Sequence, residues 1–194
     1  MPDLRERLKD ALAGTGDASS DFDLNADVRA PDIALTPAAV LIGVMRERET
    51  VILTKRSARL KHHPGQIAFP GGKQDPGDAT PVDAALREAN EEVGLPTDIV
   101  DVLGTLPPHQ TVTGYQVTPV LALIERHFDP VPEAGEVSEV FEVPLAHLLN
   151  PDNFRVEGRR WQGRKRYYYT VPYGPYYVWG ATARILRAFA GRMQ

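Results

Sequence analysis

One segment of the chain combines a helical spacing of hydrophobic residues with signals for both helix ends. At about 100° per residue, one face gathers Val82, Ala85, Leu86, Ala89 and Val93. Thr80 suits the N-cap, Pro81 suits the first helical position, and Gly94 suits the C-terminal stop. The pattern predicts an amphipathic helix that begins at Pro81 and ends before Gly94.

Shorter apolar runs predict strands. Residues 38–45 and 51–55 flank the polar turn RERET and predict a hairpin. Further strands are expected at 99–106, 116–123, from 154 to a turn at Gly163, and at 166–171 and 176–179. Further helices are expected at 2–13, 146–149 and 180–189. The order of strands, one helix, more strands and one helix indicates an α+β fold.

The N-terminal region differs in composition from the rest of the chain. Residues 14–32 are rich in Gly, Ser and Asp and are expected to form a linker or an irregular wrap. A chain of 194 residues suits one main domain with a substantial core. We therefore divide the chain into an N-terminal helix and linker, residues 1–34, and a main domain, residues 35–194.

The predicted helix carries a second, acidic face. Glu88, Glu91 and Glu92 are spaced three and four residues apart, so their charges repel by a few tenths of a kcal/mol per pair. Arg87 can offset part of this repulsion in a ladder with Asp83 and Glu91, which leaves Glu88 and Glu92 without an intrahelical cation. A divalent metal ion would compensate them, because hard cations take carboxylate ligands. The alternative is a solvated acidic face.

The residues around this face carry a family resemblance. REANEEVGL, residues 87–95, resembles the R-E-U-x-E-E-x-G-U half of the Nudix box, and Gly72 and Asp78 resemble the residues that open it. Asp78 stands where Glu is usual and lies one residue further from Arg87 than is common, so its role is left open. The resemblance implies a mixed β-sheet sandwiched between helices, a Nudix hydrolase domain over residues 35–194, and Mg²⁺ or Mn²⁺ as cofactor.

A second motif narrows the resemblance. ILTKRS at 52–57, Lys61, Gly65 and FPGG at 69–72 look like the signature of the coenzyme A pyrophosphatase branch. This branch implies hydrolysis of coenzyme A and its thioesters to 3′,5′-ADP and 4′-phosphopantetheine or its acyl derivative. Alternatives are an ADP-ribose or dinucleotide pyrophosphatase, and a module that senses a nucleotide without cleaving it. The intact carboxylates argue against the sensor.

The resemblance implies roles for these residues. Glu88 and Glu92 would be the principal metal ligands, and Glu91 would be shared between the metal and Arg87, which orients the carboxylates. A loop after the box often adds a carboxylate, for which Glu136 and Glu139 are candidates, as metal ligand or as base. The base is left open among Glu91, Glu136 and Glu139.

Phosphate-binding candidates lie just before the helix. Arg56 and Arg59 can offer guanidinium forks to a pyrophosphate, and Gly71 and Gly72 permit close backbone approach. For His62 and His63, a functional role and a place in a solvated loop are equally favoured. Residues 107–115 are expected to form a loop over the site, in which His109 could contact substrate, although an ordinary turn residue is the simpler interpretation.

A basic hairpin follows near the C-terminus, with Trp161 and tyrosines interleaved. Its cations are Arg155, Arg159, Arg160, Arg164, Lys165 and Arg166. Such a patch suits either charge protection of an edge strand or contact with a phosphorylated ligand.

Composition excludes several classes of function. The net charge is −4, so no global basic field attracts nucleic acid, and the absence of cysteine excludes thiol chemistry and disulfides. The charged segment MPDLRERLKDAL lacks the apolar run of a signal peptide, and no window approaches the roughly 20 apolar residues of a membrane span. We expect a cytoplasmic protein, with a homodimer as an option.

Overall fold

The computed structural model describes residues 3–14, 18–25, 27–28, 30, 32–161 and 163–193. At its centre, the parallel strands β2 (Thr36–Met45) and β8 (Tyr115–Ile124) pair along their whole length. Both contain long apolar runs, which suits strands that are covered on both faces. The described residues form a nine-stranded mixed sheet, completed by β1 (Ser19–Ser20), β3 (Thr50–Arg56), β4 (Ile67–Ala68), β5 (Gly71–Lys73), β6 (Val100–Thr105), β7 (His109–Gln110) and β9 (Val137–Pro144).

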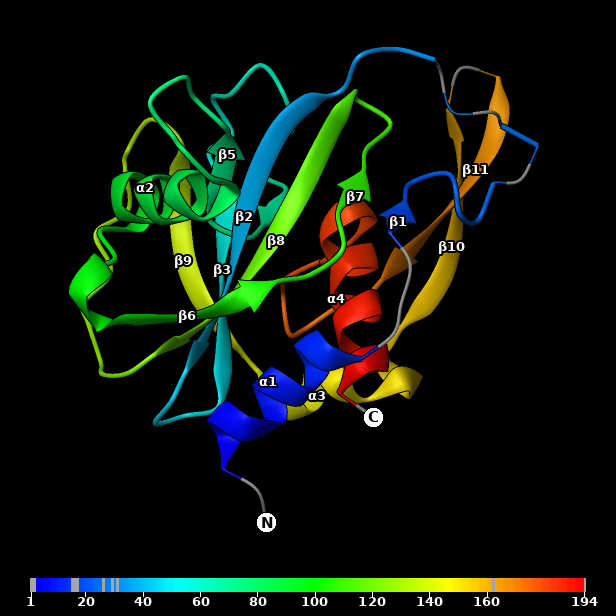
Figure 1. Ribbon diagram of the computed structural model, residues 1–194. Coiled ribbons are helices and arrows are strands. Elements are labelled where there is room, and N and C mark those ends of the chain that lie inside the picture. The colour runs from blue at the N-terminus through cyan, green and yellow to red at the C-terminus, as the bar shows by residue number, and fades with distance from the viewer. Residues whose placement is uncertain are drawn as a thin grey trace.

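Helices cover both faces of this sheet (Figure 1). One face packs α2 (Pro81–Val93), and the other packs α1 (Leu4–Ala13), α3 (Leu145–Leu149) and α4 (Gly180–Arg192). Successive residues of β8 alternate between the two cores, with Val120 and Ala122 on the α2 side and Leu121 and Leu123 on the other. Short 3₁₀ turns occur at Thr97–Ile99 and Pro151–Asn153. The predicted α+β fold, a mixed sheet sandwiched between helices, is confirmed.

The two ends of α2 form as the sequence predicts. The Thr80 hydroxyl accepts a hydrogen bond from the Asp83 N–H, the Asp83 carboxylate accepts one from the Thr80 N–H, and Gly94 adopts a left-handed conformation with φ 68°. Of the predicted ladder from Asp83 through Arg87 to Glu91, only the pair between Arg87 and Glu91 forms. Asp83 caps the helix, while Arg87 binds Glu91.

The N-terminal segment wraps around the domain. Helix α1 buries Leu4, Leu8 and Ala11 against the core, and the segment after it reaches the two-stranded sheet of β10 (Arg155–Trp161) and β11 (Arg164–Thr170). There the Asn25 amide donates to the Tyr167 carbonyl at 2.9 Å and accepts from the Tyr167 N–H at 2.8 Å. Residues 15–17, 26, 29 and 31 of the predicted linker or wrap lie outside the described residues.

Two other expectations change. The strand predicted at 176–179 does not form; it is replaced by isolated bridges between Thr170 and Trp179 and between Tyr173 and Tyr176. The predicted loop at 107–115 contains strand β7, which pairs with β1 and β8. The fully buried His109 binds the Ser19 hydroxyl at 2.9 Å and the Asp21 carboxylate at 3.0 Å, and so holds the N-terminal segment in place. Within the described residues, no helix is long and apolar enough to cross a membrane.

Candidate active site

Arg87 organises one side of the acidic face. Its guanidinium donates two hydrogen bonds to the Asp78 carboxylate, at 3.1 and 2.9 Å, and one each to Glu88, Glu91 and the Lys73 carbonyl, at 3.0, 3.1 and 3.1 Å. These bonds raise the pKa of Arg87, and the bond from Arg87 holds the pKa of Asp78 below its usual range. Arg87 thus fixes the helix to the strand and loop before it. The expectation that Glu88 lacks an intrahelical cation was wrong, because Arg87 reaches it.

Glu92 lies on the opposite side of this face and is 4% exposed. Its carboxylate accepts the Gly71 N–H at 3.1 Å, and the nearest guanidinium, that of Arg56, lies 4.0 Å away. Burial raises the pKa of Glu92 to about 7, and the negative charges of Glu88 and Glu136 add to this rise. Burial also raises the pKa of Glu88. Glu92 is therefore a carboxylate whose charge the protein only partly compensates.

The two glycines of the signature make room for these carboxylates. Gly71 has φ 155°, and a side chain there would collide with the backbone of Ala39 and Val40. A side chain at Gly72 would overlap the Glu88 carboxylate. The glycine pair thus brings strand β5 against α2 so closely that the Gly71 N–H reaches Glu92.

Arg56 lies between helix α2 and the loop that joins β3 and β4. Its N–H donates to the Gln66 carbonyl at 2.8 Å, and its carbonyl accepts the Gly65 N–H at 3.1 Å, which closes the loop into a compact turn. Among the described residues, the buried Nε of Arg56 has no hydrogen-bond partner. A buried donor without an acceptor is costly, and a bound phosphate oxygen would satisfy it.

The same loop carries the other cationic candidates. Arg59 is exposed, and its N–H donates to the Ser57 hydroxyl at 3.3 Å. His63 has a positive φ of 55°, and its pKa is lowered by partial burial and by the charge of Arg56. His62 is exposed. Arg56 therefore lies beside the carboxylates, whereas Arg59 and His62 project from the loop.

Glu136 and Glu139 have different surroundings. The negative charge of Glu136 acts on both Glu88 and Glu92, so it belongs to the acidic cluster. Glu139 accepts a hydrogen bond from the Tyr176 hydroxyl, and this tyrosine stacks on Phe141 at 3.6 Å between ring centroids. Of the two candidates, Glu136 is the one electrostatically coupled to the helix carboxylates.

The chemistry of the cluster suits a hard divalent cation. Glu88, Glu92 and Glu136 are oxygen donors. Burial raises the pKa of Glu92 and of Glu88, and the negative charge of Glu136 adds to both rises. Among the described residues, no three acidic or histidine side chains converge to form a complete metal site, and Arg87 occupies one oxygen of Glu88 at 3.0 Å. By atom type and charge these carboxylates suit such an ion, although the described side chains do not converge on one point.

Comparison with known proteins identifies the family. A model of the NUDIX domain matches residues 34–164. The chain belongs to the Nudix family. The uncharacterized Nudix hydrolase NudL of Enterobacter sp. (strain 638) is 44% identical over 154 residues, 79% of this chain and 80% of its own length. NudL of Cronobacter sakazakii is 46% identical over the same shares of the two chains. Among solved structures, the Nudix hydrolase RenU of M. smegmatis is 29% identical, with 58% of this chain and 72% of that chain covered at a TM-score of 0.48.

Membership in the family assigns the activity in general terms. This Nudix protein is a pyrophosphohydrolase that acts on a nucleoside diphosphate derivative, and Nudix enzymes generally use divalent ions such as Mg²⁺ or Mn²⁺. The structure brings Arg56, Gly71, Gly72 and the residues of α2 into one cluster with Glu136. The role of Asp78 could not be decided from the sequence. Its position at the opening of the Nudix box was a usable signal, because a one-residue insertion in a loop does not prevent its side chain from reaching Arg87.

Proposed function

We propose that this Nudix hydrolase cleaves the diphosphate bond of coenzyme A and its thioesters, with Mg²⁺ or Mn²⁺ held by Glu88, Glu92, Glu91 and Glu136. The products are 3′,5′-ADP and 4′-phosphopantetheine or its acyl derivative. The observation that carries this proposal is the contact between the two motifs. Arg56, Gly71 and Gly72, which belong to the coenzyme A signature, adjoin the helix carboxylates Glu92 and Glu88.

Each residue has a role in this proposal. A bound divalent ion supplies Lewis-acid stabilisation of the charge that develops on the phosphate oxygens. Arg56 offers its buried Nε to a phosphate oxygen, and Arg59 offers a second guanidinium from the loop. Arg87 orients Glu88 and Glu91 through its hydrogen bonds to their carboxylates. Gly71 donates its N–H to Glu92 and fixes the orientation of this carboxylate.

The reaction itself is a hydrolysis in which water attacks one phosphorus. A bond forms between the water oxygen and phosphorus, the bond from that phosphorus to the bridging oxygen breaks, and a carboxylate accepts the proton of the water. Glu91, Glu136 and Glu139 are the candidate bases. The electrostatic coupling of Glu136 to Glu88 and Glu92 favours Glu136 over Glu139.

Product analysis tests the substrate. Purified protein is incubated with Mg²⁺ or Mn²⁺ and, separately, with coenzyme A, acetyl-coenzyme A, ADP-ribose and diadenosine polyphosphates, and the products are identified by mass spectrometry. We expect 3′,5′-ADP from coenzyme A and its thioester, and no turnover after chelation of the metal. Turnover confined to ADP-ribose or the dinucleotides would overturn the coenzyme A assignment. Failure on every substrate would instead favour a sensor.

A further inference from the structure

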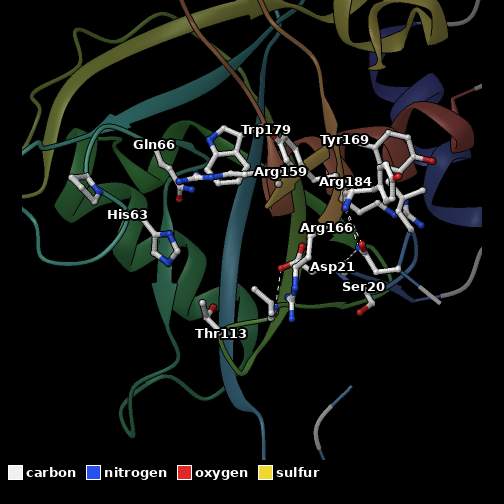
Figure 2. A pocket seen from close by; sticks show the side chains of 17 residues that line it. Ser20, Asp21, His63, Gln66, Thr113, Arg159, Arg166, Tyr169, Trp179 and Arg184 are labelled. Carbon is white, nitrogen blue, oxygen red and sulfur yellow. Dashed lines mark hydrogen bonds between the residues drawn. The ribbon is translucent and has the colours of Figure 1, made fainter. Parts of the chain in front are cut away.

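A cavity of about 530 Å³ opens between the β10–β11 hairpin and the loop that joins β3 and β4 (Figure 2). Its walls come from the N-terminal segment, the loop between β3 and β4, the β10–β11 hairpin and the start of α4. Figure 2 shows His63 and Gln66 at one end, Tyr169 and Arg184 at the other, and Arg159 between them. We call this cavity the hairpin pocket.

The loop between β3 and β4 connects the hairpin pocket to the proposed catalytic residues. The Arg56 N–H donates to the Gln66 carbonyl at 2.8 Å, and Arg56 lies 4.0 Å from Glu92. His63 lines the pocket, and its pKa is lowered by partial burial and then by the charge of Arg56. A substrate whose diphosphate lies at Arg56 can therefore extend one of its two halves into the pocket.

The pocket is basic. Arg159 and Arg166 stand directly opposite each other on the two strands of the hairpin, and both line the cavity with Arg184. Asp21, an acidic residue of the same wall, accepts hydrogen bonds from His109 and from the Val112 N–H. With three guanidinium groups and one carboxylate, the lining carries a surplus of positive charge, which suits an anionic ligand.

A second basic pair provides a contrast. Arg160 and Lys165 are also directly opposite each other, one position along the strands, but they do not line the pocket. The Lys165 ammonium lies 5.1 Å from the centre of the Tyr167 ring. Charge protection of an edge strand accounts for Arg160 and Lys165, whereas Arg159 and Arg166 face the cavity.

The pocket also offers aromatic surfaces. Tyr168 and Trp179 meet edge to face with 5.2 Å between ring centroids, and both line the cavity. Arg184 lies over the Tyr169 ring at 5.7 Å and pairs with Asp23 at 2.6 Å. Aromatic rings and guanidinium planes are the surfaces on which nucleic-acid bases stack. Cationic and aromatic side chains together suit a phosphorylated nucleoside.

We propose that the hairpin pocket binds the 3′-phosphoadenosine half of coenzyme A, with Arg159 and Arg166 at the 3′-phosphate and Tyr168 and Trp179 against adenine. This inference rests on the proposed function, because it assigns one half of that substrate. The other half, pantetheine, is uncharged and gains nothing from the arginine pair. The pocket thereby gives the enzyme a preference for substrates that carry a 3′-phosphate.

A kinetic comparison tests this preference. The ratio kcat/KM is measured for coenzyme A and for dephospho-coenzyme A, which lacks only the 3′-phosphate, in the wild type, Arg159→Ala and Arg160→Ala. We expect Arg159→Ala to lower kcat/KM for coenzyme A by about tenfold or more, the scale of a lost hydrogen bond to a charged group, with little change for dephospho-coenzyme A. Arg160→Ala is expected to keep the wild-type preference for coenzyme A over dephospho-coenzyme A. An unchanged preference in Arg159→Ala would overturn the proposal.

A binding measurement separates this inference from the proposed function. Calorimetric titration of 3′,5′-ADP and of 5′-AMP requires no turnover. Tighter binding of 3′,5′-ADP that weakens in Arg159→Ala but not in Arg160→Ala supports the pocket even if coenzyme A is not cleaved. Equal affinity for the two nucleotides, or an equal effect of the two variants, contradicts the pocket even if coenzyme A is cleaved.

Discussion

Asp78 and Glu92 are both carboxylates of the Nudix motif that adjoin α2, yet they have opposite electrostatic environments. Asp78 receives two hydrogen bonds from one guanidinium, at 2.9 and 3.1 Å, and its pKa is lowered. Glu92 has its nearest guanidinium at 4.0 Å and one backbone donor at 3.1 Å, and its pKa is raised to about 7. The protein supplies its own cation to Asp78 and leaves Glu92 short of one.

This difference separates a carboxylate that the protein neutralises from one that it leaves partly uncompensated, within one motif. The partner of Asp78 is resident, so its charge contributes to holding the helix in place. The charge of Glu92 costs free energy in the folded protein, and a bound cation would recover that cost. The same reasoning groups Glu88 and Glu136 with Glu92, since each raises the pKa of Glu92.

The largest expected effect comes from Glu92→Gln. Glutamine keeps the shape of the side chain and an acceptor for the Gly71 N–H but removes the charge. Loss of several kcal/mol of charge stabilisation lowers kcat by about a thousandfold or more, while the thermal midpoint in EDTA at pH 8 stays the same or rises. Steady-state kinetics and thermal unfolding of one preparation check both results. Near-wild-type kcat would remove Glu92 from the metal site.

The pH dependence of stability sharpens the comparison. The Glu92 carboxyl has an ordinary pKa of 4.5 when unfolded and about 7 when folded, so the folded state binds this proton more tightly. Protonation of Glu92 therefore stabilises the folded state fully below about pH 4.5. This stabilisation is lost as pH rises to about 7, by at most about 3.5 kcal/mol at about 1.4 kcal/mol per pH unit. Asp78, with its lowered pKa, acts in the opposite direction and loses its contribution at acid pH.

Denaturant unfolding in EDTA between pH 5 and pH 8 measures the contribution of Glu92 to the free energy of unfolding. We expect the free energy of unfolding of the wild type to fall relative to that of Glu92→Gln as pH rises, and Mg²⁺ to stabilise the wild type more at pH 8 than at pH 5. Parallel pH profiles for the two proteins would show that Glu92 is not the group responsible.

Glu136→Gln and Glu139→Gln form a matched pair from the same strand region. Glu136 is coupled to Glu92, so its loss is expected to lower kcat by about ten- to a hundredfold, within the range for general bases and metal-site neighbours. Glu139 binds Tyr176, so its loss is expected to change kcat by less than about threefold and to act on stability. The reverse order, measured with Mg²⁺ at saturating substrate, would make Glu139 the base.

Asp78→Asn is expected to have an effect at the lower end of the range given for Glu136→Gln. Because Arg87 keeps its bonds to Glu88 and Glu91, the fall in kcat is limited to about tenfold, the scale of losing a group that orients metal ligands. The thermal midpoint also decreases. Asp75→Asn is the control, because its carboxylate is 63% exposed and lies 3.7 Å from Arg87. If the two variants behave alike, Asp78 has no special role.

The sequence predicted the catalytic helix almost completely, because its caps, its apolar stripe and its carboxylate spacing are local signals. Thr80, Gly94 and the Glu88–Glu92 face required no information from elsewhere in the chain. The glycine pair was also recognised, although the close contact of Gly72 with Glu88 became visible only when β5 and α2 were placed side by side.

The pocket beside the site was not predicted, because it depends on residues far apart in the sequence. Nothing near Asn25 indicates that its amide binds Tyr167, and nothing near His109 indicates that it packs against Ser19 and Asp21. The segment 176–179 has the composition of a strand, but its residues make isolated bridges and place Trp179 in the pocket wall. Tertiary packing decided these features.

The bonds between Asn25 and Tyr167 have a consequence for the order of folding. They close a loop of 142 residues, and closure of so long a loop is rewarded only after the intervening chain has condensed. On the ribosome, helix α2 leaves the exit tunnel well before the hairpin is synthesised, so the wall of the hairpin pocket forms only after most of the chain has been made. Late protection of the Tyr167 amide in pulsed hydrogen exchange during refolding would show that the helix carboxylates take their places before this pocket closes.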